Sequence, residues 1–263
     1  MKVKINNFEM AYAEAGSGTP LLFIHGFPLS KAIWLPQLEA LNTSFQIITP
    51  DLRGHGDSES VPGPYSMQML AGDLNALLDN LGINQPVVIC GHSMGGYLTF
   101  EFFRQYPQRV AGIILTATRA ADDPPEGKTN RDNAAQNVMQ DGITPIVEGM
   151  LPKIVSPASF DKNPELVESV KAIMMGASVE GTVGALMAMK ERPDSTPTLE
   201  EIKVPSLVIH GRGDQIIPLA EAEQMAGSIQ DCEFVIFDNA GHLPSLEDPQ
   251  LFNNVVRDFM QQL

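Results

Sequence analysis

The sequence predicts an α/β fold, in which a largely parallel sheet is covered by helices on both faces and a helical cap is inserted into the chain. Short runs of β-branched and apolar residues alternate with segments of helical periodicity along most of the chain. Strands that alternate with helices form parallel sheets whose two faces are buried. Between residues 121 and 197 the strand runs vanish, whereas helical runs continue.

Eight segments have the composition of strands. Residues 2–6 and 8–14 alternate apolar and polar side chains, which is typical of edge strands in a hairpin. The other six are short apolar runs, which are typical of buried strands. They cover residues 21–24, 45–49, 87–90, 110–115, 206–210 and 233–237. Together these segments predict a mostly parallel, eight-stranded sheet.

Helices are expected where apolar residues recur every three or four positions. The clearest is at 66–81, where six Met and Leu side chains share one face and Gly82 follows as a stop signal. The other core helices are predicted at 35–42, 97–103, 219–227 and 248–262, and those of the insertion at 134–140, 143–151, 164–175 and 180–190. We therefore predict a core domain of residues 1–120 and 198–263, and a helical cap of residues 121–197.

Composition narrows the class of partner. The net charge of −15 argues against a nucleic acid or an anionic membrane as partner. The N-terminus lacks the apolar region of a signal peptide, and no run approaches the 18 apolar residues that indicate a membrane-spanning helix. The chain has two cysteines, which are too few for a disulfide framework. No CxxC or HExxH motif indicates a metal, and no G-x-G-x-x-G follows a strand. We expect a cytoplasmic enzyme without a cofactor, as a monomer or a small homo-oligomer.

One stretch predicts the chemistry. Gly91 and Gly95 flank Ser93 in a Gly-x-Ser-x-Gly pattern, between the strand at 87–90 and the helix at 97–103. A strand, this turn and a helix form a nucleophile elbow, in which the turn strains the serine backbone and presents the hydroxyl at the end of the sheet. Ser93 is therefore the candidate nucleophile.

A serine nucleophile needs a base, and the base needs an orienting acid. The candidate base is His242, just beyond the last strand, and the candidate acid is Asp214, beyond the strand at 206–210. Both follow strand ends, where open α/β sheets build their sites. Asp122 and Asp123 are the alternative acids. A structural role is the alternative reading for each of the remaining histidines, which are His25, His55, His92 and His210.

Hydrolysis also requires donors for the developing oxyanion. The backbone N–H of Met94 follows the nucleophile, and that of Phe27 lies in the loop after the strand at 21–24. His25, Trp34 and Leu243 are candidates for contact with substrate, although a packing role for Trp34 fits equally well. No charged side chain is expected to point at the serine, so neutral substrates are expected to be preferred.

Five motifs together resemble the α/β-hydrolase superfamily over nearly the whole chain. They are His25-Gly26-Phe27-Pro28, Pro50 to Gly56, Gly91 to Gly96, Gly211 to Asp214 and Gly241-His242. Within it, the chain is similar to bacterial carboxylesterases of the 3-oxoadipate enol-lactonase-like and cofactor-free haloperoxidase-like group. The resemblance implies an α/β-hydrolase fold.

The first functional hypothesis is a serine hydrolase that cleaves small to medium carboxylic esters through an acyl-enzyme on Ser93. A cofactor-free haloperoxidase or perhydrolase, in which peroxide replaces water, and an enol-lactone hydrolase are alternatives. A ligand receptor built on a hydrolase fold is a further alternative. Turnover of many esters, with and without peroxide, discriminates among these hypotheses.

Overall fold

The computed structural model describes residues 1–263 and contains one eight-stranded sheet with the order β1-β2-β4-β3-β5-β6-β7-β8. All eight predicted strands are present, with ends that differ from the predicted ones by two residues at most. They are β1 (Lys2–Ile5), β2 (Phe8–Ala15), β3 (Pro20–Ile24), β4 (Gln46–Pro50), β5 (Val87–His92), β6 (Val110–Thr116), β7 (Ser206–Gly211) and β8 (Cys232–Phe237).

The pairing of the strands brings distant loops to one edge of the sheet. β1 and β2 form the predicted antiparallel hairpin, β2 also pairs antiparallel with β4, and the strands from β4 to β8 pair in parallel. Ile24 at the end of β3 lies opposite Gly91, and His92 at the end of β5 lies opposite Thr116. The loops that follow β3, β5, β6, β7 and β8 therefore meet at the carboxyl edge.

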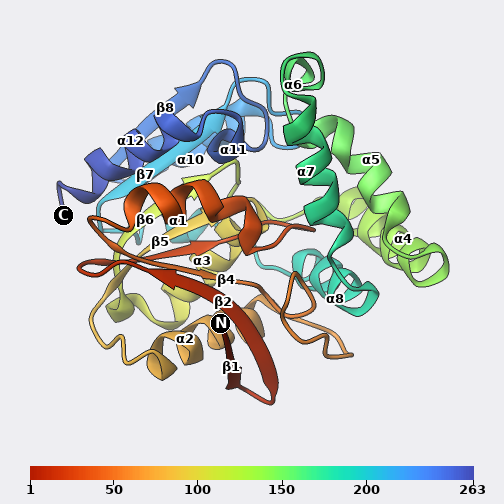
Figure 1. The fold of residues 1–263 in the computed structure, drawn as a ribbon, viewed down its shortest axis with the longest axis horizontal. Coiled ribbons are helices and arrows are strands. Elements are labelled where there is room, and N and C mark those ends of the chain that lie inside the picture. The colour runs from red at the N-terminus through yellow and green to blue at the C-terminus, as the bar shows by residue number, and fades with distance from the viewer.

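Two apolar cores cover the two faces of the sheet. Side chains alternate along β3, so that Leu22 and Ile24 join one core whereas Leu21 and Phe23 join the other. The first core contains side chains of α2 (Met67–Asn80), α3 (Met94–Gln105) and α10 (Leu219–Ser228). The second contains those of α1 (Leu35–Leu41) and α12 (Pro249–Met260), which lie on the opposite side of the sheet from α2 (Figure 1).

Six helices and no strand form the chain between β6 and β7. They are α4 (Pro125–Asp141), α5 (Thr144–Ile154), α6 (Pro157–Lys162), α7 (Pro164–Met175), α8 (Val179–Lys190) and α9 (Thr196–Leu199). We call them the α4–α9 segment; its green helices gather at one end of the molecule (Figure 1). No single helix is long and apolar enough to cross a membrane. Helices α7 and α8 taken together have sufficient length and apolar composition, but a bend of 91° separates them. The proposed boundary between core and cap stays a prediction.

The sequence analysis predicted no helix at α6 or α9, and two further differences have identifiable reasons. α4 begins at Pro125, nine residues before the predicted start at 134, because Ala135 and Val138 are its only buried residues and its first turns show no apolar periodicity. The predicted helix at 248–262 is α12, which begins at Pro249 after Asp248. The Asp248 side chain accepts a hydrogen bond from the N–H of Leu251 and so caps α12, and a separate turn, α11 (Pro244–Glu247), precedes it.

Candidate active site

Ser93 occupies a strained turn between β5 and α3. Its φ of 52° and ψ of −112° place a non-glycine residue in a sparsely populated region. The turn is held by two hydrogen bonds, from the Ser93 N–H to the Thr116 carbonyl at 3.0 Å and from the Thr118 hydroxyl to the Ser93 carbonyl at 2.8 Å. A Cβ on Gly95 would overlap the Ile24 carbonyl, so this position accepts only glycine. The local geometry is that of the predicted nucleophile elbow.

His242 and Asp214 are joined by a hydrogen bond of 2.7 Å between Nδ1 and Oδ2. Asp214 follows β7 and His242 follows β8, and both side chains are almost fully buried. The other oxygen of Asp214 accepts the N–H groups of Ile216 and Ile217 at 2.8 and 2.9 Å. These contacts fix the orientation of the carboxylate, which in turn orients the imidazole.

The pKa of the Asp214 carboxyl lies below its ordinary value. Burial raises this pKa, but the charge and the hydrogen bond of His242 lower it, and the N–H groups of Ile217 and Ile216 lower it further. Asp214 is therefore ionised at neutral pH and accepts the proton on Nδ1 of His242. None of the hydrogen bonds in the structure joins Ser93 to His242.

The two alternative acids are engaged elsewhere. Asp122 forms an ion pair with Lys128 at 2.8 Å, and Asp123 pairs with arginines near the start of the α4–α9 segment. Neither aspartate contacts His242. Of the three carboxylates considered from the sequence, Asp214 alone reaches the imidazole.

His92 supports the backbone of His242. Its Nε2 donates to the His242 carbonyl at 2.8 Å, and the centres of the two rings lie 4.8 Å apart. Burial, followed by the nearby His242, lowers the pKa of His92 to about 3, so the ring is neutral and Nε2 carries its proton. The structural role that the sequence allowed is present, but the partner was not predicted.

Glu247 holds the loop of His242 against the α4–α9 segment. One carboxylate oxygen accepts the N–H of Gly241 at 2.7 Å. The other accepts the N–H of Ser156 at 2.7 Å and the hydroxyl of Ser159 at 2.8 Å. Glu247 thus binds segments that lie more than 80 positions apart in the sequence. The sequence analysis did not identify this residue.

Replacing Glu247 with Gln should lower the melting temperature by about 2–10 °C. The amide group offers one acceptor oxygen instead of two, so the Gly241 or the Ser156 N–H loses its acceptor, at a cost of about 1–3 kcal/mol. Thermal unfolding followed by circular dichroism measures the change. Glu233→Gln, at an exposed position of β8, is the matched control. Equal melting temperatures for the two variants would contradict this role.

A cavity of about 320 Å³ opens onto Ser93. Phe27 and Ile217 line it on the side of the core, and Ala134, Ile146 and Leu186 line it from α4, α5 and α8. Side chains of the α4–α9 segment therefore form much of the wall. The volume lies at the lower end of the range for small-molecule sites.

The two predicted oxyanion donors both lie at this site. Phe27 lines the cavity with Ser93, and its N–H has no acceptor within the protein. Met94 is the first residue of α3, so its N–H has no acceptor within the helix. Both N–H groups are thus available to a bound oxygen.

The three predicted substrate contacts are not at the cavity. His25, Trp34 and Leu243 are fully buried, and none of them lines the space beside Ser93. Trp34 packs against Phe23 and Phe252, with ring centres 4.7 and 6.0 Å apart. The sequence did not reveal this packing, because position after a strand does not distinguish a side chain that faces the core from one that faces a pocket.

His25 instead joins the loops after β3 and β4. Its Nδ1 donates to the Gly26 carbonyl at 2.8 Å, and its Nε2 accepts the N–H of Leu52 at 3.0 Å. Burial and then the neighbouring His55 hold its pKa well below the usual range, so the ring is neutral, as this pair of hydrogen bonds requires.

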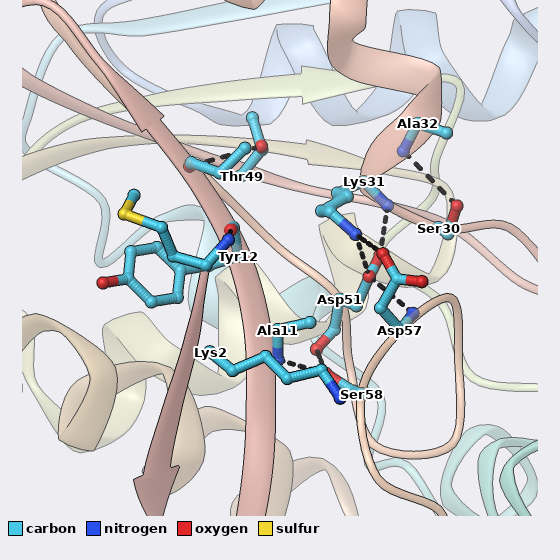
Figure 2. Close-up of polar contacts among 12 residues, drawn as sticks. Lys2, Ala11, Tyr12, Ser30, Lys31, Ala32, Thr49, Asp51, Asp57 and Ser58 are labelled. Atoms are coloured by element: carbon cyan, nitrogen blue, oxygen red, sulfur yellow. Dashed lines mark hydrogen bonds and ion pairs between the residues drawn. The ribbon is translucent and has the colours of Figure 1, made fainter.

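A second network ties the same two loops together near Lys31 (Figure 2). Asp51, fully buried, accepts the Lys31 N–H at 2.7 Å, the Lys31 ammonium at 2.5 Å and the Asp57 N–H at 2.9 Å. The ammonium also pairs with Asp57 at 2.5 Å. The loop that carries Phe27 is thus fixed at both ends. A cavity of about 540 Å³ beside this network does not include Ser93.

Charged side chains also line the cavity beside Ser93. Arg119 and Asp123 lie in the loop after β6, and Arg131 lies in α4. The sequence analysis did not anticipate charged side chains in the wall of this cavity. Sequence reasoning missed both arginines because they lie in loop and helix contexts that carry no motif.

This combination of fold and site defines a class of protein. The family model described as the alpha/beta hydrolase family matches residues 21–255. The chain therefore belongs to the alpha/beta hydrolase family, as the motifs predicted.

Its relatives include several kinds of enzyme. A solved thermophilic esterase from Thermogutta terrifontis, with malate bound, has a TM-score of 0.98 and 40% identity, and the match covers 100% of this chain and 98% of the other. The 3-oxoadipate enol-lactonase 2 of Acinetobacter baylyi is 30% identical over 92% of this chain and 88% of its own length. A non-heme chloroperoxidase of Kitasatospora aureofaciens is 28% identical over 97% of this chain and 96% of its own.

Proposed function

We propose that this protein hydrolyses carboxylic esters of small to medium size. The observation that carries the proposal is the buried His242–Asp214 hydrogen bond, which lies at the same edge of the sheet as the strained turn of Ser93. A nucleophile, a base and an orienting acid are the groups that acyl transfer requires. The 40% identity to an esterase supports this choice within the family.

In the proposed reaction the Ser93 hydroxyl attacks the ester carbonyl while His242 accepts its proton. The N–H groups of Phe27 and Met94 stabilise the oxyanion that develops. His242 then protonates the leaving alcohol, which leaves an acyl group on Ser93. Water, deprotonated by His242, attacks this acyl-enzyme and releases the acid. Asp214 stays ionised throughout and stabilises the imidazolium.

Hydrolysis of 4-nitrophenyl esters from acetate to palmitate should show a maximum of kcat/KM at a short or medium acyl chain. Each buried CH₂ contributes about 0.8 kcal/mol until the cavity is full. Beyond that length, overpacking costs about 1–3 kcal/mol. The series is measured in one buffer, with spontaneous hydrolysis subtracted. A maximum at palmitate would contradict a pocket of this size.

Two alternatives follow from the relatives and are tested alongside the ester series. Enol-lactone hydrolysis would use the same acyl-enzyme, and one relative at 30% identity is an enol-lactonase. Peroxide in place of water would give a perhydrolase, as the similarity to a chloroperoxidase suggests. Lactones added to the ester series, and halide oxidation measured with peroxide, distinguish these activities. Negligible turnover of every ester with strong peroxide-dependent oxidation would reject the esterase.

A further inference from the structure

We propose that the arginines of the cavity select esters that carry a carboxylate elsewhere in the molecule, such as monoesters of small dicarboxylic acids. This inference rests on the proposed ester hydrolysis, because it assigns a substrate class to the same site. Its basis is an excess of positive charge in the wall of the cavity that holds Ser93.

Three guanidinium groups surround one buried carboxylate. Asp123, whose side chain is 3% exposed, contacts Arg119 at 2.6 Å and Arg192 at 3.0 Å, and it also pairs with Nε of Arg131. Three positive charges against one negative charge leave a formal charge of +2. The other charged groups nearby do not cancel it: Asp122 pairs with Lys128, and Asp132 pairs with Lys190. The negative charge of Glu221 also acts on Arg119 and offsets this excess in part.

Arg192 belongs to the structural part of this cluster. It is 3% exposed, and it donates to the Met189 carbonyl at 2.7 Å and the Ala121 carbonyl at 2.9 Å. Its guanidinium also lies 4.1 Å from the centre of the Tyr97 ring. The positive charge of Arg192 therefore balances the negative charge of Asp123. The positive charges of Arg119 and Arg131 are left without a full counter-charge.

Arg119 and Arg131 retain donors that the protein does not use. Nε of Arg119 is buried without a hydrogen-bond partner, and Nη2 of Arg131 makes no hydrogen bond. Nη1 of Arg131 contacts only the sulfur of Met189, a weak acceptor, at 3.3 Å. Both side chains are about one-fifth exposed and line the cavity. Unpaired guanidinium donors in such a site favour a carboxylate, which they bind in a forked geometry.

The position of Arg119 relative to the nucleophile is fixed by the fold. Arg119 directly follows Thr118, whose hydroxyl donates to the Ser93 carbonyl. Arg131 reaches the same cavity from the first half of α4. A substrate whose ester carbonyl lies at Ser93 therefore has a carboxylate-binding pair within the same 320 Å³ space.

The test compares esters that differ only in charge. One pair is mono-4-nitrophenyl adipate and its terminal carboxamide, and the other is 3-acetoxybenzoate and 3-acetoxybenzamide, so the charge lies on the acyl or on the alcohol side. In at least one pair the kcat/KM of the anion should exceed that of the amide by on the order of 10- to 100-fold. Arg119→Gln and Arg131→Gln should each reduce this ratio about tenfold, mainly through the KM of the anion. Arg257→Gln, in α12 and outside the cavity, removes one equal charge and should leave the ratio unchanged.

A second measurement does not depend on turnover. Adipate should raise the melting temperature of the native protein more than adipamide does, and Arg131→Gln should remove the difference. Preference for the amide in both pairs, or a ratio unaffected by either arginine variant, would overturn the proposal while leaving ester hydrolysis intact. An arginine-dependent shift with adipate in a protein that hydrolyses none of the esters would instead reject the proposed function and retain the anion site.

Discussion

Ser93→Ala should abolish ester turnover, with a loss on the order of 10⁴-fold or more in kcat. The nucleophile and its base act as a unit, so removal of the hydroxyl removes the acyl-enzyme route entirely. The assay is hydrolysis of a short 4-nitrophenyl ester, together with stoichiometric labelling by an organophosphate, which should disappear in the variant.

The fold should survive this change. The Ser93 hydroxyl makes no hydrogen bond within the protein, and alanine keeps the Cβ, so the strained backbone of the turn is unaltered. We expect a melting temperature close to that of the native protein. Ser228→Ala, in α10, is the control and should retain full activity. Activity of Ser93→Ala at the native level would end the assignment of this residue as nucleophile.

Asp214→Asn should reduce kcat by about 10³–10⁴-fold with little change in KM. The carboxylate accepts from Nδ1 of His242 on one side and from the N–H groups of Ile216 and Ile217 on the other. An amide has one acceptor oxygen, so it either loses the two backbone donors or turns its NH₂ toward the imidazole. The second arrangement favours the wrong tautomer of His242, in which Nδ1 is the acceptor.

Asp122→Asn is the matched control, because Asp122 is half-buried in an ion pair with Lys128 and makes no hydrogen bond to His242. It should retain activity close to the native level. The acid would have to be reassigned to the loop after β6 if substitution of Asp122 or Asp123 abolished turnover while Asp214→Asn did not.

The Asp214 variant also has a signature in the pH dependence of stability. Because the pKa of Asp214 is lowered by folding, the unfolded chain binds this proton more tightly, and stability falls as the pH decreases. The contribution of the Asp214 carboxylate to stability is complete above the ordinary pKa of an aspartate, about 4, and is lost as the pH falls below this value. The melting temperature of the native protein should therefore decline more steeply on acidification than that of Asp214→Asn.

The proposed nucleophile, base and acid occupy positions that depend on one another through the loops. His92 binds the carbonyl of His242, Glu247 binds the N–H of Gly241, and Thr118 binds the carbonyl of Ser93. Each of these contacts joins a loop at the carboxyl edge to a different part of the chain. The geometry around Ser93 is therefore a property of the whole edge rather than of the Gly-x-Ser-x-Gly turn alone.

The sequence by itself predicted the fold because strand and helix periodicity are local. All eight strands were identified, since each is a short apolar or alternating run between turn residues. The positions of Ser93, Asp214 and His242 after strands β5, β7 and β8 were sufficient to bring them to one edge, because parallel strands end on the same side. The Asp214–His242 hydrogen bond was expected on this basis and is present.

Only the tertiary structure decided what surrounds these residues. His25, Trp34 and Leu243 follow or lie close to strand ends, yet they pack inward, because side-chain direction depends on loop conformations that periodicity does not encode. Arg119, Arg131 and Asp123 carry no motif, and their charges meet at the cavity only because α4 folds back over the carboxyl edge. Glu247 binds Ser156 across a long sequence separation for the same reason. Contacts between distant segments depend on how helices pack, and no local pattern of residues specifies them.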